Sequence, residues 1–408
     1  MNTTPPARGF SALKNPNIRW SATGSAFFTF GSRALGIVIA FQIYQLTHSA
    51  LALGWLGLVE AIPAIIVAPF GGHVADTFNR HRIIKTTRAI CLFCALGLAI
   101  LSWRAFGHTV ILFYLIIFIF GFARGFTDPA MTAFESQIVP RDLIINAASW
   151  FGSISITSSI LGQAVSGFIF AGYGATVSYI VIAGCFMASF FCVIYISPEP
   201  QIKPEKDERV FESIKIGWRA LYHIQPLFAA MALDMIAVLF GGMTILLPIF
   251  ANDILKIGAG GYGLLNATIS LGALAAMVLS MTHSPIKKAG RNILFCVAAF
   301  GVCIIVFAFS KILWLSIVML FLSGFFDGIS MIIRRAMTRL LSPDQLRGRI
   351  AAANSIFITA SNELGAFESG MLAALVGTIP CVALGGMVTL IVVAVTARWA
   401  GELRGLEL

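Results

Sequence analysis

Charged residues are scarce in this chain of 408 residues: Asp, Glu, Lys and Arg make up 11%, whereas hydrophobic residues make up 58%. Ordinary soluble domains carry about 25% charged residues, so the composition excludes a protein built mainly from such domains. It predicts a polytopic membrane protein, since a chain of this length supplies roughly twelve spans of about 20 residues joined by short loops. Little sequence would remain for a separate soluble domain.

The seven cysteines form no pattern that predicts disulfides or a metal site. Cys91 and Cys94 share a helix face, but their apolar run contains no histidine to complete a zinc site. Six cysteines lie inside apolar runs, where a thiol behaves as a small hydrophobic side chain: Cys91, Cys94, Cys185, Cys192, Cys296 and Cys303.

Signatures of enzymes and of ATP-driven pumps are also missing. The sequence has no glycine-rich loop ending in lysine to hold a nucleotide phosphate, and no exposed nucleophile stands beside a base. We therefore predict no enzyme activity, no cofactor, no metal and no ATP coupling. The N-terminus has no short apolar core with a cleavage site, and we interpret it as a cytoplasmic tail that leads into the first span.

The formal net charge of +10 does not predict nucleic-acid binding. The basic residues lie at the ends of apolar runs, as they do where positive charge holds loops on the cytoplasmic side of a membrane. Their distribution predicts that both termini are cytoplasmic, which requires an even number of spans. Twelve are expected, at 20–46, 53–72, 88–105, 110–131, 145–170, 176–197, 226–250, 262–283, 292–309, 313–335, 350–376 and 379–399.

The longest polar stretch, Ser197 to Tyr222, divides the chain near its middle. We predict an N-terminal six-helix half over 1–197, a cytoplasmic linker over 198–225 and a C-terminal six-helix half over 226–408. Apolar residues recur at helical spacing from Glu208 to Tyr222, which predicts an amphipathic helix along the inner leaflet. A solvated linker and a regulatory element are the alternatives.

The two halves repeat one another. The sequence GFARG at 121–125 matches GFFDG at 324–328, an offset of 203 residues. A duplication of six helices explains such matches, and small residues that recur four apart allow close helix packing. Three further glycine pairs have the same offset: Gly162 with Gly365, Gly167 with Gly370, and Gly174 with Gly377.

A short charged turn, Gly72 to Arg82, lies between the second and third spans. Gly72 is expected to let the helix ends approach closely, and Asp76 to face a helix N-terminus or a basic partner. The turn resembles the loop after the second helix of the major facilitator superfamily, written G-x-x-x-D-R/K-x-G-R/K-R/K. Gly72, Asp76 and Arg80 fit that pattern, whereas Thr77 and Asn79 depart from it, and Arg82 lies one residue beyond its last basic position.

Four further stretches (44–54, 71–76, 127–130 and 346–350) are similar to bacterial facilitators related to the enterobactin exporter, a group that includes multidrug efflux proteins. The resemblance implies an all-α protein with twelve transmembrane helices in two pseudo-symmetric halves. It also implies a bacterial inner-membrane transporter that exports amphipathic, siderophore- or drug-like molecules by alternating access and proton antiport. Import or facilitated movement of a metabolite or lysolipid is the alternative, and a non-transporting scaffold or sensor is a remote one. Two complete halves need no partner, so we expect a monomer.

A charged side chain inside the hydrocarbon is expected to have an ionic partner or a functional role, because it costs about 2.5–3.5 kcal/mol at the centre of a span. Arg124 and Asp128 stand one turn apart and can pair. The resemblance implies that Asp128 helps the Gly72–Arg82 turn to lock an inner gate; a structural ion pair is the alternative. The eight candidates are Arg33, Glu60, Arg124, Asp128, Asp234, Asp327, Glu363 and Glu368.

Glu363 falls near the middle of the eleventh span, where burial disfavours the charged carboxylate and suits a proton carrier. Helix packing and substrate contact are its alternative roles. Asp327 is the repeat mate of Arg124, so these two are expected either to meet across the halves or to line the cavity separately. The other coupling or cavity-lining candidates are Asp234 and Glu368, together with Arg33 and Glu60, which are expected to pair between the first two spans.

The segment from Gly162 to Gly167 resembles the antiporter signature G-P-x-x-G-G of the superfamily, with Gln163 in place of proline and Ser166 in place of a glycine. Gln163, Ser166 and Asn362 are candidates for substrate contact. Helix packing is the alternative for Gln163 and Ser166.

Overall fold

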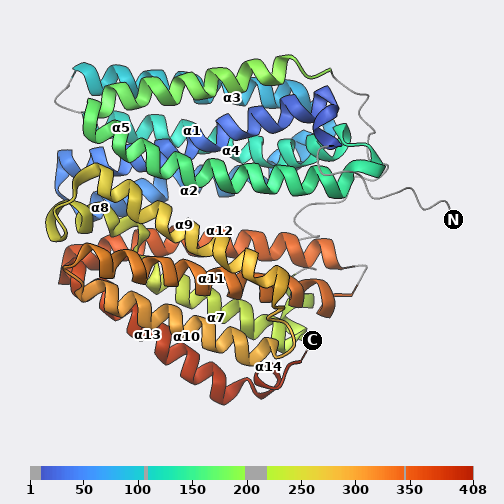
Figure 1. Cartoon of the computed structure of the whole chain (residues 1–408), viewed down its shortest axis with the longest axis vertical. Coiled ribbons are helices and arrows are strands. Elements are labelled where there is room, and N and C mark those ends of the chain that lie inside the picture. Colours follow the sequence, from blue (N-terminus) through green and yellow to red (C-terminus); the bar gives the residue numbers. More distant parts are fainter. Residues whose placement is uncertain (1–10, 105–108, 198–217, 344–345, 408) are drawn as a thin grey trace. The chain divides into compact units, whose positions relative to one another are not determined.

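The computed structural model describes residues 11–104, 109–197, 218–343 and 346–407, and the regular elements among them are helices (Figure 1). The long helices are α1 (Pro16–Thr47), α2 (Ala50–Thr77), α3 (Arg80–Arg104), α4 (Thr109–Ile138), α5 (Ile144–Ile194), α7 (Gln225–Gly241), α9 (Gly258–Thr282), α10 (Ala289–Phe309), α11 (Leu313–Leu341), α12 (Arg347–Val376) and α13 (Thr378–Trp399). The short ones are η1 (Ala12–Lys14), η2 (Arg141–Leu143), η3 (Met243–Leu246), α8 (Leu247–Ile249), η4 (Phe250–Ile254) and α14 (Gly401–Arg404).

Ten segments among the described residues are long and apolar enough to cross a bilayer. One of them, α5, contains two helices that meet at Gly174, where the backbone leaves helical geometry. The 30-residue helix α12 is not among the ten. Counting the two arms of α5 separately and adding α12 gives twelve segments at the predicted positions, so the expected all-helical membrane fold is confirmed.

Contacts divide the chain into two compact units. Unit 1 consists of Met1–Ile39 and Val59–Asp207, and unit 2 of Ala40–Leu58 and Glu208–Leu408. The end of α1 and the start of α2 therefore belong to unit 2. There, Tyr44 donates a hydrogen bond to Asp253 of η4, and the ring of Trp55 meets that of Phe367 on α12 edge-on, with 5.0 Å between the ring centroids.

Glycines related by the internal repeat have matching roles in the two units. Gly174 and Gly377 both have positive φ angles, 80° and 91°, and each ends one helix and begins the next. Only glycine adopts such angles without steric cost. Gly162 and Gly365 both lie against backbone: an added Cβ would be 2.6 Å from a carbonyl oxygen of α1 and 2.8 Å from one of α7, respectively. The duplication read from the sequence is thus present in the backbone geometry.

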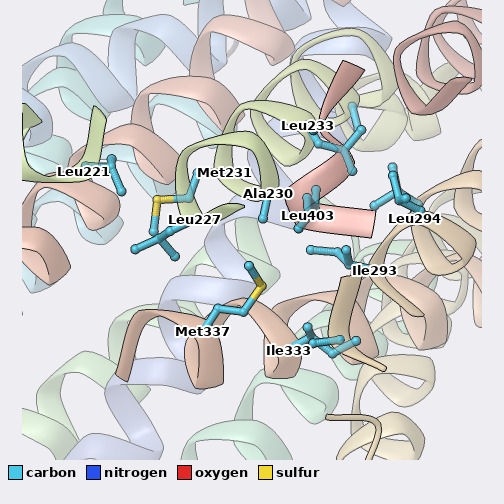
Figure 2. Close-up of a cluster of buried hydrophobic side chains, with 14 of the residues drawn as sticks. Leu221, Leu227, Ala230, Met231, Leu233, Ile293, Leu294, Ile333, Met337 and Leu403 are labelled. Atoms are coloured by element: carbon cyan, nitrogen blue, oxygen red, sulfur yellow. The ribbon is translucent and has the colours of Figure 1, made fainter. Parts of the chain in front are cut away.

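A buried hydrophobic cluster joins α7, α10, α11 and α14 within unit 2. Figure 2 shows its side chains converging from these helices. The cluster fixes α7 relative to α11, and these two helices carry the charged residues of the candidate site. Its labelled members are Leu221, Leu227, Ala230, Met231, Leu233, Ile293, Leu294, Ile333, Met337 and Leu403.

Three predicted segments differ from the structure or fall outside it. The charged turn predicted between Gly72 and Arg82 is mostly helical, because α2 continues to Thr77 and α3 begins at Arg80. The span predicted as continuous over 226–250 is broken after Gly241, where the 3-10 helix η3 follows a glycine pair. Most of the predicted amphipathic linker helix, which begins at Glu208, lies outside the described residues. Its described part, together with the next residue, is helical over 218–223.

Candidate functional site

Two acids of unit 2 share one arginine. Arg334 on α11 forms an ion pair with Asp234 on α7, and only 9% and 11% of these side chains is exposed. The other terminal nitrogen of Arg334 lies 3.8 Å from Asp327, whose side chain is 49% exposed. The group therefore contains one tightly paired acid, one loosely paired acid and a formal net charge of −1.

Helix spacing and the packing of α7 against α11 bring these three charged groups together. Asp327 and Arg334 are seven residues apart on α11, which is two helical turns and places them on one face. The guanidinium has five N–H donors in a planar fork, so it can serve two carboxylates at once. Asp234 reaches it from α7, which packs against both α11 and α12.

Asp234 and Asp327 also line an open cavity of unit 2, and its space of about 690 Å³ includes the part that is open to solvent. Most of its wall is apolar, and the broken end of α7 opens onto it at Gly241 and Gly242. A few polar groups in a mostly apolar wall are typical of small-molecule sites. The remaining polar lining residues are Thr244, Ser323, Ser330 and Asn362.

Unit 1 contains a second arginine between two acids. Arg124 of α4 donates a hydrogen bond to Glu60 of α2, with 2.8 Å between the atoms. Its other terminal nitrogen lies 3.7 Å from Asp128, so the pairing predicted from their one-turn spacing is confirmed. Asp128 is 63% exposed, and an ion pair this accessible contributes little stability.

The α2–α3 connection is held by Arg80. Its Nε donates to the carbonyl of Ala75 at 3.0 Å and Nη1 to that of Ala133 on α4 at 3.3 Å. A cation at the end of α2 also suits the negative pole of that helix. The close approach predicted for Gly72 is made instead by Gly71, whose added Cβ would meet the α4 backbone, whereas one on Gly72 would meet nothing within 4 Å.

The candidates on α12 lie in different surroundings. Asn362 lines the unit 2 cavity and donates to the carbonyl of Ile358 at 2.9 Å. Glu363 instead faces the start of α2, where its Oε2 is 3.8 Å from the position of a Cβ on Gly57. Glu368 accepts a hydrogen bond from Ser369 at 3.5 Å. The structure therefore brings Asn362, but not Glu363 or Glu368, to the cavity.

The candidates on α5 face helix neighbours. Ser166 is buried and donates to the carbonyl of Gln163 at 3.2 Å. Arg33 of α1 lies beside the same helix, with its Cβ 3.2 Å from a Cβ position on Gly162. These contacts favour the packing role over substrate contact for Ser166. The side chain of Asp76 lies outside the described part of the chain.

Two arginines that matter in the structure escaped the sequence reasoning. Arg334 falls at the end of the span predicted over 313–335, and Arg88 stands at the start of the span predicted over 88–105, where basic residues are expected to set topology. Arg88 is 1% exposed: it donates to the carbonyl of Gly24 at 3.0 Å and to the hydroxyl of Ser189, and it stands 4.4 Å from the ring centroid of Phe28. The seven-residue spacing of Asp327 and Arg334 is the signal that could have found the first.

Comparison with known proteins agrees with this architecture. The sequence model of the Major Facilitator Superfamily matches residues 21–357. The enterobactin exporter EntS of Salmonella choleraesuis (strain SC-B67) is 23% identical over 376 residues, covering 91% of this chain and 89% of the relative.

Two solved structures share the fold. A bacterial homologue of the iron transporter ferroportin, in an inward-facing state, has a TM-score of 0.74 at 16% identity and covers 94% of this chain and 98% of its own. The nucleoside transporter NupG has a TM-score of 0.72 at 12% identity, with 94% and 99% covered. At such identities the likeness shows the fold alone.

Proposed function

Because the chain belongs to the major facilitator superfamily, a family of secondary transporters rather than enzymes, we propose that it exports amphipathic small molecules in exchange for protons. The direction is supported by similarity to a bacterial exporter over nine-tenths of the chain. The substrate is siderophore- or drug-like in this proposal, and the membrane is the bacterial inner membrane with both termini in the cytoplasm. The protein works as a monomer by alternating access.

One observation carries the coupling part of the proposal: Asp327 is half exposed in a cavity, beside an arginine already engaged by another acid. A carboxylate whose cationic partner is shared and distant can accept a proton without leaving an unpaired arginine. Asp234, which holds Arg334 tightly, keeps the arginine compensated while Asp327 changes charge. We assign the proton to Asp327 for this reason, and keep Glu363 as the second coupling candidate.

The inner gate is a separate part of the proposal. Arg80 ties the end of α2 to α4 through two carbonyl oxygens, and Asp128 lies on the same helix α4 with most of its carboxylate exposed. We propose that Gly72, Asp76, Arg80 and Asp128 control opening on the cytoplasmic side.

The test uses everted membrane vesicles energised to an acidic interior. Candidate siderophores, dyes and drugs are added in turn, and loss of the proton gradient is followed by fluorescence dequenching of a pH probe. Proton antiport predicts dequenching by at least one compound in wild-type vesicles and a strongly reduced response in Asp327→Asn vesicles. Asp142→Asn, which removes an exposed acid of η2, is the matched control and should respond as the wild type.

The proposal is overturned if Asp327→Asn and Glu363→Gln both leave gradient-driven transport intact. Accumulation of labelled compound by intact cells that lack other carriers would instead favour the importer of a metabolite or lysolipid. A partner that co-purifies in stoichiometric amount, with no flux of any compound, would favour the scaffold or sensor.

A further inference from the structure

The charge around the unit 2 cavity is negative. Arg334 balances one of two aspartates, Asp234, and leaves Asp327 with half of its side chain exposed in the cavity. No lysine, arginine or histidine is found among the described residues that line the cavity wall. The C-terminal end of α7 opens onto the same space, and the C-terminal end of a helix carries a partial negative charge of about half a unit.

A second observation points to a ligand. Ser330 lines the cavity one turn after Asp327 on α11, and it is 1% exposed. Its hydroxyl has no hydrogen-bond partner among the described residues. Buried hydroxyls are nearly always hydrogen-bonded in native proteins, so this one is available to pair with a bound molecule, water or ligand, in the cavity.

The rest of the wall fits an apolar body rather than a small hydrated ion. The rings of Phe300 and Phe326 line the cavity together with Met243. Aromatic faces attract organic cations in dry surroundings, and methionine adapts to ligands of varied shape.

Building on the exporter function proposed above, we propose that this cavity binds an organic cation. The substrate then carries an ammonium, phosphonium or guanidinium group beside an apolar body. The cation is held by Asp327, the substrate accepts a hydrogen bond from Ser330, and the apolar part lies between the phenyl rings. An anionic chelator would meet uncompensated carboxylate here, so this class of substrate differs from anionic siderophores.

The test is equilibrium binding to the full-length protein purified into lipid nanodiscs, without any gradient. The probes are radiolabelled tetraphenylphosphonium and tetraphenylborate, which have the same shape and opposite charge. Saturable binding of the phosphonium with no comparable binding of the borate is expected. Asp327→Asn should weaken phosphonium binding at least about tenfold, the usual effect of losing a charged partner, whereas Asp142→Asn should leave it unchanged.

Tetraphenylphosphonium has no hydrogen-bonding group, so a second probe, a protonated lipophilic amine with an ether oxygen, tests Ser330. Ser330→Ala should weaken binding of that amine about threefold or more but leave phosphonium affinity and melting temperature at their wild-type values. If Asp327→Asn does not fold, Asp327→Glu should retain phosphonium binding and Ser330→Ala still carries the test.

Equal affinity for the borate, or wild-type phosphonium affinity in a folded Asp327→Asn protein, overturns the cation site. Export of an anionic compound with no phosphonium binding would leave the proposed function standing and this inference refuted. Phosphonium binding that requires Asp327, in a protein that moves no compound across a membrane, would support the cation site and refute the proposed export function.

Discussion

Replacing Asp234 with asparagine should destabilise unit 2 more than any other removal of an acid discussed here. Only 9% of the Arg334 side chain and 11% of that of Asp234 is exposed, and removing one partner of a buried pair costs about 3–5 kcal/mol. Asp327, 3.8 Å from the arginine, can take up part of the charge, so we expect the lower end, about 3 kcal/mol. At about 2–4 °C per kcal/mol for a body of this size, the melting temperature should fall by about 6–12 °C.

The assay is thermal denaturation of the purified protein in detergent, followed by loss of the monodisperse peak in size-exclusion chromatography. Asp128→Asn is the matched control because it removes an acid from an exposed pair, and less than about 1 kcal/mol should be lost. The double variant Asp234→Leu with Arg334→Met should recover most of the stability, since an apolar pair can replace a buried ion pair. A single Asp234→Asn variant that melts at the wild-type temperature would refute the buried pair.

Two further predictions concern the backbone and the inner gate. Gly174→Ala should cost about 1–3 kcal/mol, because its φ of 80° and ψ of 177° lie in a backbone region that is almost confined to glycine. Gly172→Ala places its methyl group in open space and should melt as wild type. Equal melting of the two variants would contradict the kink geometry. Arg80→Gln removes two hydrogen bonds and should cost about 1 kcal/mol, and under the proposed gate it should also change the initial rate of vesicle transport. An unaltered rate would count against a gating role for Arg80.

The fold could be predicted because the bilayer imposes it. Backbone polar groups in hydrocarbon must be satisfied within each segment, so apolar runs of sufficient length become helices, and the repeat follows from glycines such as Gly174 and Gly377. Helix ends were predicted less well. Helix α2, for example, continues to Thr77 through residues predicted as a charged turn, because polar residues are compatible with a helix outside an apolar core. The break after Gly241 was not predicted, because helices also tolerate glycine pairs that serve packing.

The candidate site was predicted in part. Asp327 and Asp234 were identified because a carboxylate in an apolar run is rare, but their partner Arg334 was missed. Basic residues near a span end serve topology so often that Arg334 and Arg88 carried no distinct signal without knowing how far each helix extends. The direction in which Glu363 points, toward α2 rather than into the cavity, depends on helix rotation. Sequence periodicity fixes rotation poorly where lipid and protein faces are both apolar.

The measurement that tests proton-coupled export by Asp327 most directly uses purified protein in proteoliposomes with a pH dye trapped inside. Substrate identified in the vesicle screen is added to one side, and proton flux is recorded with no other protein present. The account predicts that substrate movement drives protons the opposite way in the wild type and in Asp142→Asn, and that Asp327→Asn liposomes show neither flux. Substrate movement without proton flux, or undiminished proton flux in Asp327→Asn, would contradict it.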